Sequence, residues 1–467
     1  MQFTVPFGSV ECIFFLQFWK TYHNKMIQWR NEMDRHYYDR MQEKLDQLKE
    51  ANRPEPIRSD GAGALDLGPR DLKRDEENPD MIVPPATDHG LIPNLKFSFS
   101  DTHMTIKPGG WSREITKREL AISDTFAIVD MNLSPGVREM HSHQQSEFGF
   151  VLVGGARVTA VDEMGRNFIA DCKPGEGWIF PKNIPHSIQG LHEGCEFLML
   201  FDKGTYSENH TFSISELFSH LPKDVLSANF GCPESMFDKI PKEQVYITDG
   251  GDPGTLESQT ITSPYGKVPN TYKHELINVK PINGDGGSIR ILDNRNFPAC
   301  DTVAVAMVEV EPGAMREIHW HSNNDEFQYY IQGKARMTVF MPGPKARTFN
   351  YQAGDVGYVE VGGFHYIQNI GTEKLVFLEF FNSSHYSDIS LAQWLANTPK
   401  EVIKSCLNLP DEFIDQLNQE SNPVVRYSGF EFPSASGTPQ NVQYFKNFDY
   451  KKKDVKLGSS DVIGENE

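Results

Sequence analysis

The segments Arg138-Glu-Met-His-Ser-His143 and Arg316-Glu-Ile-His-Trp-His321 carry the same pattern, an Arg-Glu pair followed by two histidines one residue apart. Each segment is followed by a glutamate and, further along, by a third histidine. The offset between the copies is 178 residues for the paired histidines and 179 for the later glutamate and histidine. Repetition of a full set argues against chance core histidines and predicts two metal sites. The predicted ligands are His141, His143, Glu147 and His186 in the first copy and His319, His321, Glu326 and His365 in the second.

The sequence that flanks the two sets is repeated as well. Pro135-Gly136 in the first copy matches Pro312-Gly313 in the second, and residues 221–225 match residues 398–402. An internal repeat of this length predicts two domains of the same fold in one chain. At 467 residues, the chain is long enough for each domain to bury a core of its own.

The composition is that of a globular protein, with 38% hydrophobic and 23% charged residues. The net charge of −19 argues against binding to nucleic acid, because such binding depends on clustered cations that neutralise phosphates. An anionic substrate would gain no long-range attraction from the protein as a whole, so local arginines would have to bind it.

The amino-terminal region lacks the features of a targeting signal. The apolar run Cys12–Trp19 follows Glu11 and has neither the basic start nor the small-residue cleavage site of a signal peptide. It is also too short to span a bilayer. The six cysteines are scattered without a CxxC pair, which is compatible with a reducing compartment. We therefore expect no membrane partner and a cytoplasmic location, with secretion as the alternative.

Four segments are expected to lie outside the repeated domains. Residues 1–50 are predicted to form a helical extension, because their apolar residues recur at steps of three and four. Residues 51–95 are rich in proline, glycine and charge, which is typical of an extended arm or linker. Residues 236–276 are expected to link the two domains, and residues 426–467 to form a frayed tail.

The repeated domains consist of short alternating segments punctuated by glycine, which is typical of strands and tight turns. Residues 96–235 and 277–425 are therefore predicted to form two small β-barrels or jelly rolls, so that the fold is dominated by β-structure. Each barrel is expected to be followed by a helical stretch, at residues 214–229 and 391–407.

Strand geometry explains how each set of ligands would meet. Alternate side chains of a strand point the same way, so the paired histidines should face one side together. Polar turn residues separate them from the glutamate, which should open the next strand, and the third histidine should arrive from another strand. A set of three imidazoles and one carboxylate suits Mn or Fe and leaves Zn, Cu and Ni open. Four protein ligands leave coordination positions free for a substrate or O2, so the sites are catalytic in type.

The two motifs with their flanks, PGVREMHSH at residues 135–143 and PGAMREIHWH at residues 312–321, resemble those of the bicupin oxalate decarboxylases. The resemblance runs from Pro54 to Val425 and includes PEPIRSDGAG at its beginning and GDVGYV before the last histidine. It implies a cupin fold for each barrel, Mn in both sites, O2 as a catalytic co-reactant and a homohexamer. The reaction that it implies is the decarboxylation of oxalate to formate and CO2.

The resemblance also implies roles for two arginines and one glutamate. Arg138 and Arg316 stand three residues before the first histidine of each set and would bind a carboxylate of the substrate through charge-assisted hydrogen bonds. The alternative for both is a structural ion pair at the rim of the barrel. Glu208, in the segment Ser207–Thr211 after the first barrel, matches the family's lid and would deliver a proton to carbon as CO2 leaves.

The repeat allows the two lids to be compared. With the 177-residue offset of the helices that follow, Glu208 aligns with His385, so only the first copy would offer a carboxylate at this point. We therefore expect catalysis in barrel one, with Glu208 and Arg138 as its catalytic residues. The alternative for Glu208 is that it begins or caps the next helix.

Two positions depart from the family pattern. Ser142 stands between the first paired histidines, where the family usually has an aromatic residue, and His210 replaces a small lid residue. The nearest rival activity is that of an oxalate oxidase, which would use the same ligands to release H2O2 and CO2, but a lid glutamate favours decarboxylation. A storage or sugar-binding bicupin without catalysis is the third possibility, and the eight intact ligands weigh against it.

Overall fold

The computed structural model describes residues 74, 77–78, 91–207, 211–343 and 345–426. The helix expected in residues 1–50, nearly all of the arm expected in residues 51–95 and the tail from residue 427 on lie outside the described residues. Both barrels belong to one compact unit, which comprises residues 92–343 and the described residues from 351 on.

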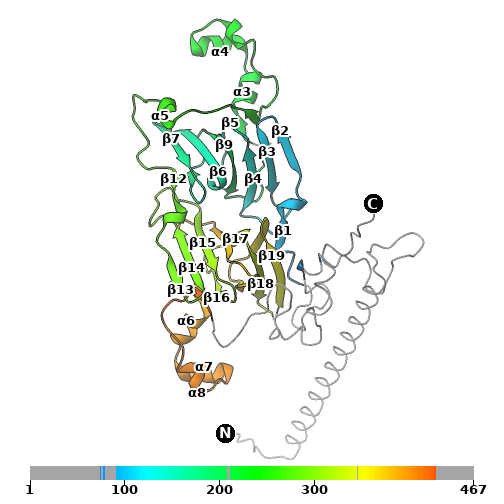
Figure 1. The fold of residues 1–467 in the computed structure, drawn as a ribbon, viewed down its shortest axis with the longest axis vertical. Helices are drawn as coiled ribbons and strands as arrows, with labels where there is room; N and C mark the ends of the chain where they lie inside the picture. The colour runs from blue at the N-terminus through cyan, green and yellow to red at the C-terminus, as the bar shows by residue number, and fades with distance from the viewer. Residues whose placement is uncertain (1–73, 75–76, 79–90, 208–210, 344, 427–467) are drawn as a thin grey trace, which may run out of the picture. The chain divides into compact units, whose positions relative to one another are not determined.

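Barrel one is built from one antiparallel sheet of eleven strands, with the order β12-β8-β6-β9-β4-β3-β2 and with β5, β7, β10 and β11 attached beside this path (Figure 1). The two longest strands, β6 and β9, pair with each other along most of their length. Register shifts on either side of Gly154 bend this pair, so the two strands contribute to both faces of the barrel. The strands are β2 (Met104–Lys107), β3 (Gly110–Ile115), β4 (Ala127–Leu133), β5 (Gly136–Ser142), β6 (Glu147–Val161), β7 (Asn167–Cys172), β8 (Gly177–Phe180), β9 (His186–Phe201), β10 (Phe212–Ser213), β11 (Ile247–Asp249) and β12 (Lys273–His274).

Barrel two repeats this path with its long strands interrupted. One sheet has the order β1-β20-β17-β22-β15-β14-β13, and a second contains β18-β21-β16-β23 with β24 beside β16. Gly333 separates β17 from β18 and has a φ of 87°, a conformation that glycine adopts without strain. The strands are β1 (Lys96–Ser98), β13 (Ile282–Gly284), β14 (Gly287–Leu292), β15 (Ala304–Val310), β16 (Met315–Trp320), β17 (Glu326–Gln332), β18 (Lys334–Met341), β19 (Lys345–Gln352), β20 (Asp355–Val359), β21 (Phe364–Asn369), β22 (Leu375–Phe381), β23 (Ile389–Ser390) and β24 (Val424–Val425).

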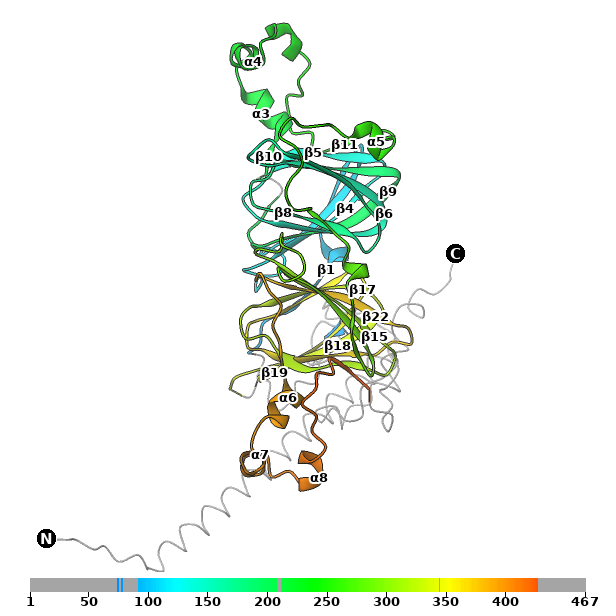
Figure 2. The ribbon, with the colours of Figure 1, turned by 90° about the vertical axis from the view of Figure 1, so that its left-hand side faces the viewer.

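Short strands are exchanged across the boundaries expected from the sequence. Strand β1 was expected at the start of barrel one, but it pairs with β20 of barrel two. Residues 236–276, expected to be a linker, supply two strands to barrel one, because β11 pairs with β5 and β12 pairs with β8 (Figure 2). The repeat therefore marks the bulk of each barrel but not every strand that completes it.

The two barrels share a continuous hydrophobic core. One cluster of buried side chains contains residues of both barrels, and Phe148 contacts Phe380 across it with ring centroids 5.6 Å apart. A polar contact accompanies this core, since Thr125 Oγ1 lies 2.9 Å from the hydroxyl of Tyr358, which donates to Asp325 Oδ2 at 2.6 Å. Burial of this apolar surface makes each barrel part of the other's support.

Each expected helical stretch is broken into two short helices by a proline. Pro222 stands at the amino-terminal cap of α4 and Pro399 at that of α7, because proline lacks the N–H that a continuous helix would need at this point. In Figure 1, these helices project from the ends of their barrels. The helices and 3-10 turns are η2 (Phe99–Asp101), α3 (Ile214–His220), α4 (Lys223–Phe230), η4 (Glu234–Phe237), α5 (Leu256–Gln259), η5 (Leu276–Asn278), α6 (Leu391–Ala396), α7 (Lys400–Leu407) and α8 (Asp411–Ile414).

Within the described part of the chain, none of the helices combines the length and the apolar character that crossing a membrane would require. The cysteines placed by the structure are all free thiols, and three of them are buried. These five residues are Cys172, Cys195, Cys232, Cys300 and Cys406.

Candidate metal centres

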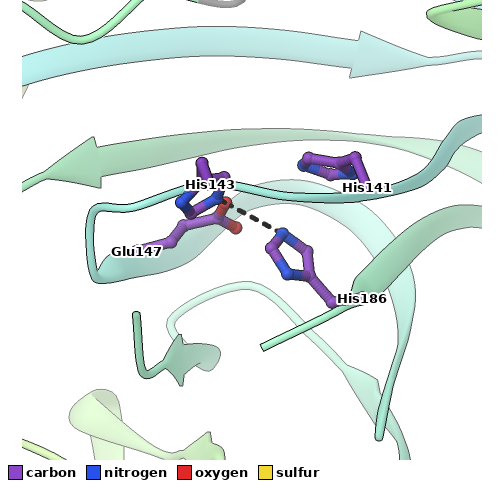
Figure 3. A group of neighbouring side chains, drawn as sticks. All are labelled: His141, His143, Glu147 and His186. Carbon is purple, nitrogen blue, oxygen red and sulfur yellow. Dashed lines mark hydrogen bonds and ion pairs between the residues drawn. The ribbon is translucent and has the colours of Figure 1, made fainter. Parts of the chain in front are cut away.

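The centre of barrel one brings together four buried side chains from three strands (Figure 3). His141 lies in β5 with His143 just beyond its end, while Glu147 opens β6 and His186 opens β9. Glu147 Oε2 lies 3.1 Å from Nε2 of His143 and 3.3 Å from Nε2 of His186. The four ligand atoms all lie within 4.8 Å of one another, which is close enough for all of them to bind one ion.

The centre of barrel two has the same construction. His319 lies in β16 with His321 just beyond its end, Glu326 opens β17, and His365 lies in β21. Glu326 Oε2 lies 3.1 Å from Nε2 of His321 and 2.8 Å from Nε2 of His365. The structure thus brings both predicted ligand sets together, each from the three strands that the spacing implies.

Every one of the six imidazoles is held in a single tautomer by the backbone. A carbonyl oxygen can only accept a hydrogen bond, so Nδ1 must carry the proton and Nε2 presents its lone pair to the centre. The sequence gave no indication of these partners. Nδ1 donates from His141 to Glu139 O (2.7 Å), from His143 to Gln145 O (2.8 Å), from His186 to Ile184 O (2.7 Å), from His319 to Glu317 O (2.8 Å), from His321 to Ser387 O (2.8 Å) and from His365 to Gly363 O (3.0 Å).

The electrostatics of the centres favour the forms that bind metal. Burial lowers the pKa of His141 and of His319 well below the usual histidine value, and the guanidinium that precedes each in the motif adds to the effect. Burial alone would raise the pKa of Glu147 and Glu326, but the facing imidazoles outweigh it and hold the pKa of both well below its usual range. Neutral imidazoles and ionised carboxylates therefore persist into mildly acidic solution, and these are the forms that bind a metal ion.

The donor atoms that face each centre fit a bound cation. Several of them are buried and form no hydrogen bond with any residue that the structure describes. Buried polar atoms of this kind are costly unless another group satisfies them. A first-row divalent ion would satisfy them and keep open positions for further ligands. The atoms are Nε2 of His186, His319, His321 and His365 and Oε2 of Glu326.

The second oxygen of each glutamate is held by a side chain that the sequence analysis missed. In barrel one, the indole N–H of Trp178 donates to Glu147 Oε1 at 2.6 Å. In barrel two, the side-chain amide of Gln328 donates to Glu326 Oε1 at 2.7 Å. Each donor fixes the carboxylate so that its other oxygen points at the centre.

The two donors reach the same place from opposite strands. Trp178 on β8 is paired with Gly149 on β6, whereas in barrel two Gln328 on β17 is paired with Gly357 on β20. A Cβ added to Gly149 would lie 2.1 Å from the Trp178 indole, and one added to Gly357 would lie 2.6 Å from Gln328 Oε1. Each glycine therefore makes room for the donor on the neighbouring strand.

We expect Trp178→Phe to weaken metal binding in barrel one by roughly 10- to 100-fold, the usual effect of losing a group that orients a ligand. The buried Glu147 Oε1 would lose its donor while the apolar packing stays nearly unchanged. Metal retained against increasing chelator, measured per chain, tests this. Trp111→Phe, at a partly exposed position, is the control and should retain both ions. Equal retention by the two variants would contradict the assigned role.

The cupin family pattern matches residues 98–236 and 275–415. Across 379 residues, the chain is 50% identical to oxalate decarboxylase OxdC of Bacillus subtilis (strain 168), and the match covers 81% of this chain and 98% of that protein. The chain is a bicupin of the oxalate decarboxylase family. The family expected from the motifs and the fold of two β-barrels are both confirmed.

Further relatives and solved structures agree with this assignment. The bicupin is 37% identical over 379 residues to a probable oxalate decarboxylase of Arthroderma benhamiae, covering 79% of this chain and 93% of that protein. A solved structure of a mutant of Bacillus subtilis OxdC matches with a TM-score of 0.76 and 49% identity, covering 80% of this chain and all of the other. A second solved structure with the same values comes from work on the Mn(II) centres of the Bacillus subtilis enzyme.

The two motif arginines of the bicupin are fully buried, but their surroundings differ. Arg138 lies over the ring of Tyr246, 4.5 Å from its centroid, and donates to Thr211 Oγ1 at 3.4 Å. Arg316 donates to Asp388 Oδ2 at 2.6 Å. The structural ion pair considered as an alternative for these arginines is therefore present in barrel two.

A tyrosine marks the start of the loop that follows each barrel of the bicupin. Tyr206 packs against the ligand His143, with ring centroids 5.8 Å apart, and Tyr386 packs against the ligand His321 at 5.9 Å. Each tyrosine also contacts the phenylalanine that ends the preceding strand. The two tyrosines are therefore equivalent, and they are 180 residues apart.

The end of the loop has a different offset. Ser213 pairs with His141 and Ser390 pairs with His319, so these serines are equivalent and are 177 residues apart. The loop of barrel one is consequently three residues longer than that of barrel two. Its central residues, Glu208, Asn209 and His210, lie outside the described residues.

The difference in loop length corrects one expectation. His385 precedes Tyr386 and is not the counterpart of Glu208, because the constant offset does not hold across the loop. The expectation that only the first copy has a carboxylate in its loop is also wrong, since Asp388 lies in the short loop of barrel two.

Proposed function

We propose that this bicupin decarboxylates oxalate to formate and CO2 in barrel one, with Mn in both centres and with O2 required but not consumed overall. The observation that carries the proposal is the relationship to oxalate decarboxylases, at 50% identity over nearly the whole of one of them, in a chain that keeps both ligand sets. The centres suit Mn because their ligands are imidazoles and a carboxylate with open positions. When bound, Mn would polarise a coordinated carboxylate and provide the redox chemistry with O2.

The residues of barrel one would bind and orient the substrate. Arg138 is buried beside the centre and carries a permanent positive charge, so it favours a carboxylate group there even though the net charge of the whole chain is −19. Its position over the ring of Tyr246 fixes the guanidinium plane. A bound oxalate would thereby present its second carboxylate to a defined part of the site.

The reaction requires a proton at carbon. Hydrogen oxalate gives formate and CO2 when its C–C bond breaks and a C–H bond forms, so atoms and charge balance without an external oxidant. We assign delivery of this proton to Glu208, because the sequence places this carboxyl group in the loop that follows barrel one. A positioned carboxylic acid is a common general acid in such steps.

The proposal is tested by incubating the Mn-loaded protein with oxalate under air and assaying formate and H2O2 in parallel. Formate close to one per oxalate consumed, with little H2O2, is the expected result. H2O2 and CO2 without formate would indicate an oxalate oxidase, and no turnover by protein that holds two ions per chain would indicate a binding or storage bicupin.

Activity is expected to fall as the pH rises from about 4 to 7, the range that follows from the reference pKa values of carboxyl groups. Glu208 must be protonated to donate, and its protonated fraction decreases about tenfold for each pH unit above its pKa. The pH profile of kcat for formate production tests this. A flat or rising profile would argue against a carboxylic acid as the donor.

The assembly and the location of the protein are also part of the proposal. The family relationship supports a homohexamer, which analytical ultracentrifugation would test by the mass in solution. The scattered cysteines and the lack of a signal-peptide pattern support a cytoplasmic location, which fractionation of the producing cells would test.

A further inference from the structure

The Arg316 guanidinium of barrel two already binds a carboxylate of its own chain. Asp388 Oδ2 accepts from Arg316 Nη2 at 2.6 Å and from the hydroxyl of Tyr386 at 2.9 Å. Tyr386 in turn accepts from Arg316 Nη2 at 2.7 Å. A short charge-assisted bond of this kind is what a substrate carboxylate would require from the arginine.

The charge state of these groups agrees with this pairing. Burial would raise the pKa of Asp388, but the Arg316 guanidinium outweighs it and holds this pKa below its usual value. A second carboxyl group, Glu379, lies 3.7 Å from Arg316 Nε, and burial together with the charge of Glu326 raises its pKa to about 8. Asp388 is therefore the ionised partner that neutralises Arg316.

The loop that carries Asp388 is fixed on both sides of this contact. The carbonyl oxygen of Ser387 accepts from Nδ1 of the metal ligand His321 at 2.8 Å. The N–H of Tyr386 donates to Asp293 Oδ2 at 3.1 Å. Asp388 is thus held in place by the same short loop that orients a ligand, so it cannot leave Arg316 without disturbing that loop.

Barrel one differs at the matched position. Thr211 stands two residues before Ser213, as Asp388 stands two residues before Ser390, and each of these serines pairs with the first histidine of its set. The Thr211 hydroxyl accepts from Arg138 Nη2 at 3.4 Å and carries no charge. The repeat therefore substitutes a neutral hydroxyl for a carboxylate at the one position that contacts the arginine.

We infer that Asp388 is an internal substitute for the substrate carboxylate, which occupies the Arg316 site and excludes oxalate from barrel two. An oxalate ion entering barrel two would have to displace Asp388 from Arg316 and would leave a buried carboxylate without its cation. Specificity for one barrel is thereby achieved by repulsion in the other, while both keep their metal ligands. The inference rests on the proposed function only for the identity of the anion.

Binding stoichiometry tests this without turnover. Oxalate is titrated calorimetrically, in the absence of O2, into protein that has been shown to hold two Mn ions per chain. The wild type should bind one oxalate per chain, and Asp388→Thr, which installs the barrel-one residue, should bind two. Asp388→Asn, which keeps the shape of the side chain, should also bind two. Asp301→Thr, at an exposed aspartate of barrel two, is the control and should bind one.

The location of the second oxalate is tested by blocking barrel one. His186→Ala alone should bind no oxalate, and His186→Ala combined with Asp388→Thr should bind one. The reciprocal change, Thr211→Asp, brings a carboxylate to Arg138 and should weaken oxalate binding in barrel one by roughly 100-fold or more, the scale expected for a buried charge pair.

Two outcomes would overturn the inference. They are binding of two oxalates by the wild type, and binding of only one by both Asp388 variants when these hold two ions. Thr211→Asp keeps the test open if the Asp388 variants fail to fold, because unchanged affinity in that variant also contradicts the inference. Failure of the proposed function is seen separately, as absence of formate from the wild type under air.

Discussion

Glu208→Gln is expected to lower formate production by roughly 100-fold or more, the usual scale for losing a general acid. Glutamine keeps the length and hydrogen-bonding capacity of the side chain but carries no acidic proton. Oxalate would still bind, because Arg138 and the four ligands of barrel one are unchanged. Without a proton delivered to carbon, oxidation competes better, so H2O2 per oxalate consumed should rise. Parallel assays of formate and H2O2 at fixed pH measure both effects.

The matched control is Glu216→Gln. Glu216 is an exposed carboxylate in α3, soon after the loop, and its removal should leave formate production unchanged. His385→Gln tests a different position from Glu208, because the two residues are not equivalent in the repeat. Full formate production by Glu208→Gln would show that the proton comes from another group.

His186→Ala is expected to reduce the metal content from two ions per chain to one and to abolish formate production. Removal of one of four ligands leaves an incomplete set in barrel one, while the ligands of barrel two lie on other strands and are untouched. Metal analysis of the purified protein, combined with the formate assay, measures both losses.

Three companion variants make this result specific. His365→Ala should also leave one ion per chain, and the double variant should hold none. His220→Ala, at an exposed histidine at the end of α3, should keep two ions. Two ions per chain in His186→Ala would show that the ligand set of barrel one is wrongly assigned.

The sequence predicted the two ligand sets because strand geometry is local. Residues one position apart on a strand face the same side, and the glutamate after a tight turn opens the next strand, so spacing alone places Glu147 and Glu326 near their histidines. The repeat then supplied the independent check that a single set lacks. The third histidine of each set followed from the closure of a β-barrel.

Features that depend on strand pairing were not predicted. Trp178 and Gln328 hold equivalent glutamates from different strands, and only the pairing with Gly149 and Gly357 shows that they are alternatives. Strands β11 and β12 have three and two residues, which is too short for an alternating pattern to be recognised.

The alignment of the two loops failed for a related reason. A constant offset was applied to a segment in which one copy has three more residues, and loops tolerate such insertions better than strands do. The position of the insertion became clear only from Tyr206 and Tyr386, whose rings contact equivalent metal ligands. Asp388 was overlooked in the sequence because of this error.

The exchange of β1 and β12 between the barrels has a consequence for how the protein evolves and unfolds. A chain cut at the boundary of the repeat would give neither half all its strands, and each half would expose a sheet edge prone to aggregation. The barrels should therefore melt in a single cooperative transition and draw on one reserve of stability, roughly 5–15 kcal/mol for a typical domain. A destabilising substitution in barrel two then lowers the folded fraction of barrel one, so selection on one centre also maintains the other.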